Sequence, residues 1–102
     1  MRKEEIKKKL FDSVKNLPHK ETVGRLSLFG SYVHGKQTEK SDIDVLVDFL
    51  PGSRITLFTL ASIKNALEKE LGSEVDLIPR DCLRESLREK IENDAEIAYE
   101  RS

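Results

Sequence analysis

LFGSYVHGKQTEKSDIDVLVDF, residues 28–49, is the stretch that decides how the rest of this chain is interpreted. Its two ends belong to segments rich in aliphatic residues, Val23–Phe29 and Ile43–Phe49, which are typical of buried strands. The first segment stops at Gly30 and Ser31, and the polar run that follows has space for one short helical turn. The stretch therefore predicts two strands joined by a short helix and a loop.

Helical periodicity continues on both sides of these strands. Upstream, apolar residues three and four positions apart predict a helix, ended by Pro18, that buries Ile6, Leu10, Val14 and Leu17. Downstream, residues 56–71 predict a second helix with Gly72 as its C-cap. The apolar stripe of this second helix is interrupted by Lys64 and otherwise consists of Leu57, Leu60, Leu67 and Leu71.

The C-terminal third predicts one more strand and one more helix. Glu74–Ile78 is a short apolar strand closed by Pro79. Asp81 is placed to cap a last helix, in which the apolar residues are Leu83, Leu87, Ile91 and Ala95. Three strands among three or four helices indicate an α/β fold in which helices cover a small sheet. With 102 residues, we expect a single domain over residues 1–102.

Composition and charge exclude several classes of protein. The 18 basic and 19 acidic residues give a net charge of -1, which argues against direct nucleic-acid binding. The longest apolar runs are too short to span a bilayer and the charged N-terminus lacks a signal-peptide pattern, so we expect no membrane partner and a cytoplasmic location. Cys82 is the only cysteine, which excludes an internal disulfide or a cysteine-based metal cluster.

Residues that could bind a phosphate or a metal ion lie at the end of the first predicted strand and at the start of the second. A glycine between a strand and a helix lets an anion approach the backbone, so Gly30 and Ser31 predict a phosphate site or, alternatively, an ordinary turn. Asp42 and Asp44 project from one face of a strand because they are two residues apart. Adjacent carboxylates repel each other unless a cation lies between them, so this pair indicates a Mg²⁺ site or else a strand end that faces water.

A third aspartate, Asp76, occupies the middle of the short strand predicted at residues 74–78. If this strand pairs beside the one that carries Asp42 and Asp44, three carboxylates meet at one edge of the sheet. Such a cluster can hold two metal ions for phosphoryl transfer, and one of its members can accept a proton. The alternative is an exposed charge that protects an edge strand from aggregation.

Gly-Ser, ten residues, Asp-x-Asp and a later lone aspartate resemble the DNA polymerase β-like nucleotidyltransferase superfamily, in particular its minimal nucleotidyltransferases. The resemblance implies a fold with a small mixed sheet, ATP as substrate and two Mg²⁺ ions. It implies that Gly30 and Ser31 hold the triphosphate and that Asp42 and Asp44 bind both ions. Asp76 would complete the second ion and help to deprotonate the acceptor hydroxyl.

The same resemblance implies a protein partner. With 102 residues we expect no acceptor domain within the chain, so the acceptor is expected on a HEPN-domain toxin that is adenylylated on a tyrosine in a complex of the two proteins. One departure is that Val33-His34 stands where the family often has Ala-Arg, which replaces a constant positive charge by a largely neutral group. Two other functions remain open: a non-catalytic antitoxin that covers its partner, and an aminoglycoside-type nucleotidyltransferase formed by a homodimer.

Overall fold

The computed structural model describes residues 2–36, 38 and 41–101. The helices are α1 (Lys3–Ser13), α2 (Ser31–His34), α3 (Leu57–Leu71) and α4 (Glu85–Asp94). The strands are β1 (Val23–Phe29), β2 (Ile43–Phe49), β3 (Val75–Pro79) and β4 (Glu96–Glu100). Short 3-10 turns are η1 (Val14–Asn16), η2 (Lys20–Thr22) and η3 (Arg80–Cys82). No helix in the described ranges is long and apolar enough to cross a membrane.

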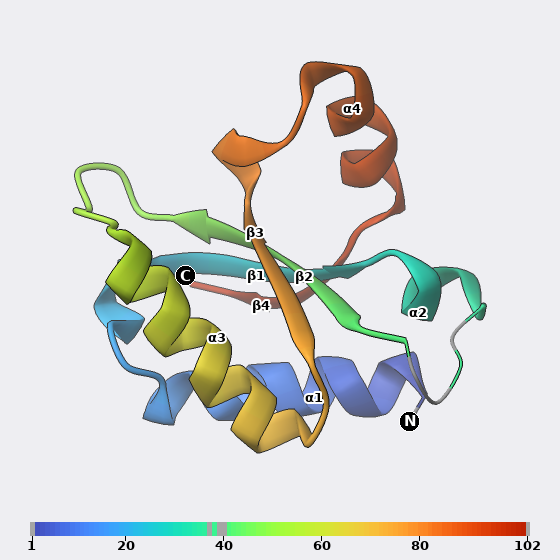
Figure 1. Cartoon of the computed structure of the whole chain (residues 1–102), viewed down its shortest axis with the longest axis horizontal. Coiled ribbons are helices and arrows are strands. Elements are labelled where there is room, and N and C mark those ends of the chain that lie inside the picture. Colours follow the sequence, from blue (N-terminus) through green and yellow to red (C-terminus); the bar gives the residue numbers. More distant parts are fainter. Residues whose placement is uncertain (1, 37, 39–40, 102) are drawn as a thin grey trace.

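One four-stranded sheet, in the order β3-β2-β1-β4, organises the molecule (Figure 1). β1 is antiparallel to both β2 and β4, whereas β2 and β3 run parallel. Parallel neighbours need a crossover connection, and α3 supplies it between β2 and β3. The predicted small mixed sheet with flanking helices is therefore confirmed, with one strand, β4, more than the three that the sequence pattern indicated.

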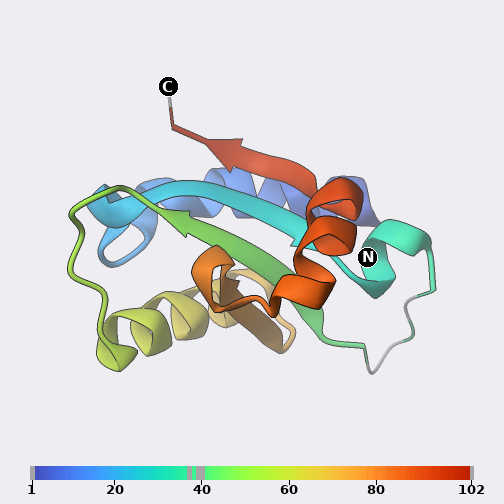
Figure 2. The same cartoon turned by 90° about the horizontal axis from the view of Figure 1, so that it is seen from above.

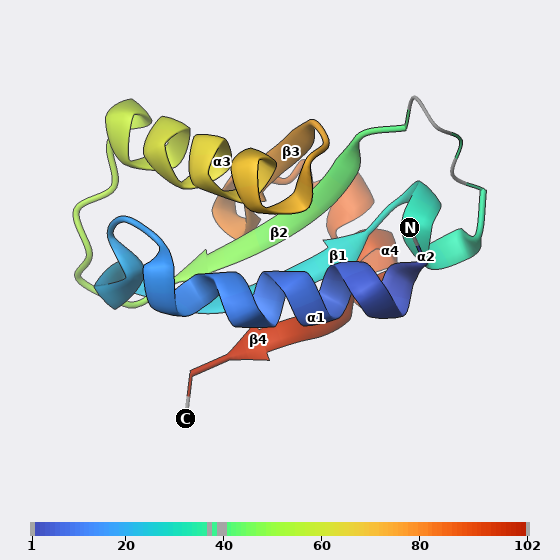
Figure 3. The same ribbon diagram turned by 90° about the horizontal axis from the view of Figure 1, so that it is seen from below.

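Helices α1 and α3 cover one face of the sheet and create the main core (Figure 3). All four apolar residues predicted to be buried in the N-terminal segment lie in this core: Ile6, Leu10, Val14 and Leu17. On β2, the alternate residues Ile43, Val45 and Val47 are fully buried beneath the same two helices. Because strand side chains alternate, the aspartates of β2 must leave the sheet on its other face.

Helix α3 begins and ends where the sequence predicts. The Thr56 hydroxyl accepts a hydrogen bond from the Thr59 N–H at 3.2 Å, the Thr59 hydroxyl accepts one from the Thr56 N–H at 3.3 Å, and Gly72 ends the helix with φ of 68°. The predicted stripe is wrong in its first half, because Leu57 is 83% exposed. The face in contact with the core runs in steps of four through Thr59, Ile63, Leu67 and Leu71.

The C-terminal prediction also needs correction. Asp81 lies in the η3 turn and does not cap α4, which begins after Arg84 without a side-chain cap. Residues beyond Asp94 leave the helix, and Glu96–Glu100 form β4, in which two glutamates flank three apolar residues. This run is too short to be separated from the preceding helix by pattern alone. Tyr99 of β4 is half-buried, and its ring centroid lies 6.1 Å from that of Phe11.

Helix α4 lies over the other face of the sheet (Figure 2). An arginine connects it to β2: Arg80 donates to Asp48 through Nε at 2.5 Å and Nη2 at 3.1 Å, and its Nη1 lies 2.9 Å from Glu92. Bidentate contacts of this kind fix orientation as well as adding stability. The half of the face around Asp48 is therefore closed by an ion-pair network.

Two alanine substitutions distinguish the predicted stripe of α3 from the observed one. Ile63 is fully buried and Leu60 is partly exposed, so Ile63→Ala should lower the free energy of unfolding by about 2–4 kcal/mol and Leu60→Ala by less than about half of that. Urea denaturation of the two variants measures the difference. Equal losses would contradict the orientation of α3 described above.

Candidate active site

The Gly30-Ser31 turn meets the beginning of β2 at one end of the sheet. In the antiparallel register Phe29 pairs with Asp44, so Gly30, which follows β1, lies directly against the Asp44 side chain. Gly30 has φ of 78°, and a Cβ atom on it would overlap the Asp44 carboxylate. Only glycine fits both the backbone conformation and this close approach. Ser31 is the first residue of α2, so the turn joins a strand to a helix as predicted.

Strand β3 brings a second acid to the same place. The parallel register pairs Asp44 with Asp76 and buries their neighbours Ile43 and Val75 on the opposite face. Asp42 immediately precedes β2 and is exposed. The pairing of β2 with β3, on which the three-carboxylate prediction depended, is therefore present. The separate pairing of β1 with β2 places Gly30 beside Asp44. Ser31 lies next to Gly30 at the start of α2.

Asp44 lies in an environment that disfavours its charged form. Partial burial, followed by the charges of Asp76 and Asp42, raises its pKa from the ordinary 3.8 to about 6. Asp48, four residues further along β2 on the same face, has Arg80 as a bidentate partner. In the part of the chain that the structure describes, no basic side chain forms an ion pair with Asp44. A cation bound at this end of the sheet would relieve the repulsion.

The side chains present fit a Mg²⁺ ion that is completed by substrate. Among the described residues, no three His, Cys, Asp or Glu side chains stand close enough together to enclose a metal by themselves. Mg²⁺ in nucleotide sites takes one or two carboxylates and fills its remaining positions with phosphate oxygens and water. An open set of carboxylate oxygens beside a glycine turn therefore suits Mg²⁺ together with a phosphate better than a structural metal.

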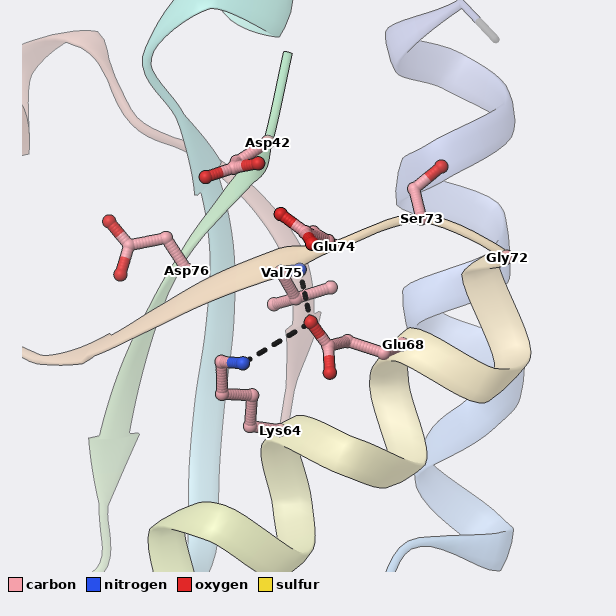
Figure 4. A pocket seen from close by; sticks show the side chains of 8 residues that line it. All are labelled: Asp42, Lys64, Glu68, Gly72, Ser73, Glu74, Val75 and Asp76. Carbon is pink, nitrogen blue, oxygen red and sulfur yellow. Dashed lines mark hydrogen bonds and ion pairs between the residues drawn. The ribbon is translucent and has the colours of Figure 1, made fainter. Parts of the chain in front are cut away.

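Asp42 and Asp76 also form one wall of a pocket of about 630 Å³ between the start of β3 and α3 (Figure 4). Lys64 and Glu68 of α3 form the opposite wall, with Nζ 3.2 Å from Oε2. The Val75 N–H donates to the same Oε2 at 3.0 Å, and this bond together with Lys64 lowers the pKa of Glu68. The sequence placed Lys64 only along a helix stripe, so its place in a pocket is decided by the packing of α3 against β3.

His34, at which the chain departs from the family pattern, contacts helix α4. Its Nε2 lies 3.2 Å from Oδ2 of Asp94 at the end of α4. With Gly30 and Leu87 it lines a hollow of about 290 Å³ between α2 and α4. His34 therefore connects the segment after the glycine turn to α4. No local sequence pattern indicates this contact.

Comparison with known sequences agrees with this geometry. The nucleotidyltransferase domain family matches residues 7–98, and the chain therefore belongs to that family. It is 41% identical to a candidate protein adenylyltransferase of Methanocaldococcus jannaschii over 89% of this chain and 91% of the relative. It is 34% identical to the protein adenylyltransferase MntA of Thermococcus cleftensis over 86% of this chain and 87% of the relative.

Solved structures place the chain within a narrower group. A candidate minimal nucleotidyltransferase is 37% identical, with a TM-score of 0.68 over 82% of this chain and 84% of that one, which confirms the resemblance to minimal nucleotidyltransferases. A toxin–antitoxin structure with AMP-PNP has a TM-score of 0.73 at 22% identity, covering 94% and 74%. An MNT antitoxin in complex with the tri-AMPylated HEPN toxin of Shewanella oneidensis has a TM-score of 0.67 at 17% identity, covering 96% and 72%. The last two likenesses concern the fold alone.

The contact between Gly30 and Asp44 can be tested with a matched pair of glycine substitutions. Gly30→Ala should lower the free energy of unfolding by about 2–3 kcal/mol, because it combines backbone strain with the overlap on Asp44. Gly35→Ala, at φ of 70° with open space around it, should cost about 1 kcal/mol from strain alone. Thermal unfolding of both variants gives the comparison, and equal costs would contradict the close approach.

The raised pKa of Asp44 predicts a pH-dependent gain in stability for Asp44→Asn. The folded protein holds the carboxyl proton more tightly than the unfolded chain does, so wild-type stability falls as the pH rises from about 4 to about 6. Above this range the asparagine variant should be more stable by on the order of 1 kcal/mol, a figure reduced for solvent screening of a half-buried group. Denaturation at pH 7.5 and pH 4 checks the sign: the advantage should be present at the higher pH and absent at the lower.

Proposed function

We propose that this protein transfers AMP from ATP to a hydroxyl, on a tyrosine of a HEPN-domain toxin, and so acts as the antitoxin of a pair. The observation that carries the proposal is the junction of Gly30, Asp44 and Asp76 at one end of the sheet. The adenylyltransferase relatives, identical at a third or more of the aligned positions, support the reaction class. The fold shared with antitoxin chains supports the partner. A cytoplasmic location, where ATP is available, belongs to the same proposal.

In this proposal each element of the site has one task. The turn at Gly30 leaves room for the triphosphate to approach the backbone, and the Ser31 hydroxyl donates to a phosphate oxygen. Asp42, Asp44 and Asp76 hold two Mg²⁺ ions. When bound, Mg²⁺ supplies positive charge against the α-phosphate and the leaving group.

The transfer itself is an in-line displacement. The acceptor oxygen forms a bond to the α-phosphorus of ATP, and the bond from that phosphorus to the oxygen bridging to the β-phosphorus breaks. Pyrophosphate leaves with the electron pair of this bond. Asp76, exposed at the edge strand, accepts the proton of the hydroxyl and passes it to water. The protein contributes mostly position and charge, because it forms no covalent bond to the nucleotide.

Label transfer from ATP tests the proposal. The protein is incubated with α-labelled ATP, Mg²⁺ and a HEPN-domain protein. Wild type should label the partner, whereas the double variant Asp42→Asn with Asp44→Asn should reduce labelling at least about a thousandfold, because the charge that holds the metal ions is removed. Omitting Mg²⁺ should have the same effect. Asp12→Asn, an equivalent change on the far face of α1, is the matched control and should retain labelling.

The two alternative functions give different results in the same assay. A non-catalytic antitoxin would neutralise its partner equally well as the double variant, since neutralisation would need only binding. An aminoglycoside-type enzyme would label an antibiotic without the partner. Persistent labelling of the partner by the double variant would reject the proposed roles of Asp42 and Asp44.

A further inference from the structure

The hollow of about 290 Å³ between α2 and α4 lies on the face of the sheet that carries the Asp44 carboxylate (Figure 2). Phe29, which lines the hollow, is the cross-strand partner of Asp44, and such partners project from the same face. The alternate residues of β1, Leu26 and Leu28, belong to the main core on the opposite face. Gly30 also lines the hollow, so this space directly borders the glycine turn.

Helix α4 contributes a lysine to the lining of this hollow. Lys90 is exposed, and in the described ranges it forms no ion pair. His34 is the other basic residue of the lining, and its Nε2 lies 3.2 Å from Oδ2 of Asp94, which offsets any charge that the imidazole carries. Lys90 therefore provides the positive charge that the hollow can offer to an anion.

A second cation of α4 has hydrogen-bonding capacity that the protein does not use. Nε of Arg88 is shielded from water, and in the part of the chain that the structure describes it has no hydrogen-bond partner. Arg88 lies one helical turn before Glu92, whose partner Arg80 also binds Asp48 of β2, so this face of α4 is turned toward the sheet. A shielded donor without an acceptor is unfavourable, which indicates that an acceptor group enters between α4 and the sheet.

In-line displacement places the leaving group on the side of the hollow, a step that rests on the proposed function. The attacking and leaving oxygens lie on opposite sides of the phosphorus atom. Asp76, the proposed proton acceptor, is on β3, whereas Gly30 follows β1, and β2 lies between these strands. The pyrophosphate part of ATP therefore lies toward Gly30 and α4 when the acceptor hydroxyl approaches from the side of Asp76.

We propose that Lys90 binds the β- and γ-phosphates of the nucleotide held at the Gly30 turn. The three proposed metal-binding aspartates offset most of the charge of two Mg²⁺ ions, so a triphosphate in the site needs a further cation. A lysine ammonium is suited to this because it donates to phosphate oxygens as a compact positive charge. The last helix of the chain thereby supplies the permanent charge that His34, at the end of α2, does not.

Lys90 is suited to a test because its side chain is exposed and no residue of α4 is buried. Lys90→Gln removes the charge, and Lys90→Arg retains it. Lys9→Gln makes the same change in charge on an exposed position of α1, which covers the opposite face of the sheet, and serves as the matched control. Lys36→Gln tests the rival position, because Lys36 is exposed just after α2 but lies outside the lining of the hollow.

Isothermal titration calorimetry with ATP or AMP, in the presence of Mg²⁺ and without any acceptor protein, measures the contact. Lys90→Gln should raise the Kd for ATP about tenfold and change the Kd for AMP less than about twofold, because AMP lacks the β- and γ-phosphates. Lys90→Arg should bind ATP within about twofold of wild type, since the positive charge is kept. Lys9→Gln and Lys36→Gln should change neither Kd.

Several outcomes would overturn the role of Lys90. They are an unchanged Kd for ATP in Lys90→Gln, an equal loss of ATP and AMP binding, or an equal effect of Lys9→Gln. A larger loss with Lys36→Gln would assign the contact to the segment after α2 instead. Because no acceptor is present, a selective loss of ATP binding without label transfer in the earlier assay would support the role of Lys90 and count against the proposed reaction. Label transfer together with unchanged ATP binding by Lys90→Gln would reject this inference alone.

Discussion

Repulsion between Asp44 and Asp76 is the constraint around which this end of the molecule is built. The parallel pairing of β2 with β3 places the two carboxylates side by side, and the antiparallel pairing of β1 places Gly30 against one of them. Nothing in the described part of the chain neutralises Asp44 as Arg80 neutralises Asp48. The fold keeps this unfavourable arrangement because the opposite face of the same strands is buried in the main core, which holds their register.

The division of the sheet into two faces separates stability from chemistry. Ile43, Val45 and Val47 are fully buried under α1 and α3, so a shift of β2 by one residue would expose them and bury the aspartates. Register is therefore specified by the core, and the positions of the acids follow from it. On the other face only part of β2 is closed, by the network of Arg80 with Asp48 and Glu92. Under the proposed function, the remainder of this face is the side on which the nucleotide binds.

Local sequence patterns predicted the elements correctly where a run of aliphatic residues or a single glycine defines the element. The strands 23–29 and 43–49 have the predicted bounds, and Gly72 caps α3 as expected. The same patterns gave wrong predictions where one element directly follows another, and where a helix has apolar residues on more than one face. The leucines at 57 and 60 mislead because the burial of α3 depends on how it crosses α1. Strand β4 went unrecognised because its five residues become a strand only by pairing with β1.

The candidate acids, the glycine turn that precedes them and the family resemblance can all be identified from the sequence, because the spacing of Gly30, Ser31, Asp42 and Asp44 is a property of the chain order alone. It also contained Asp76, but only as a hypothesis about strand pairing. Tertiary structure decided that β3 lies beside β2, that Gly30 contacts Asp44, and that Lys64, Glu68 and Glu74 form a pocket next to the acids. These residues are far apart along the chain, and only the packing of the α3 crossover against the parallel strands brings them together.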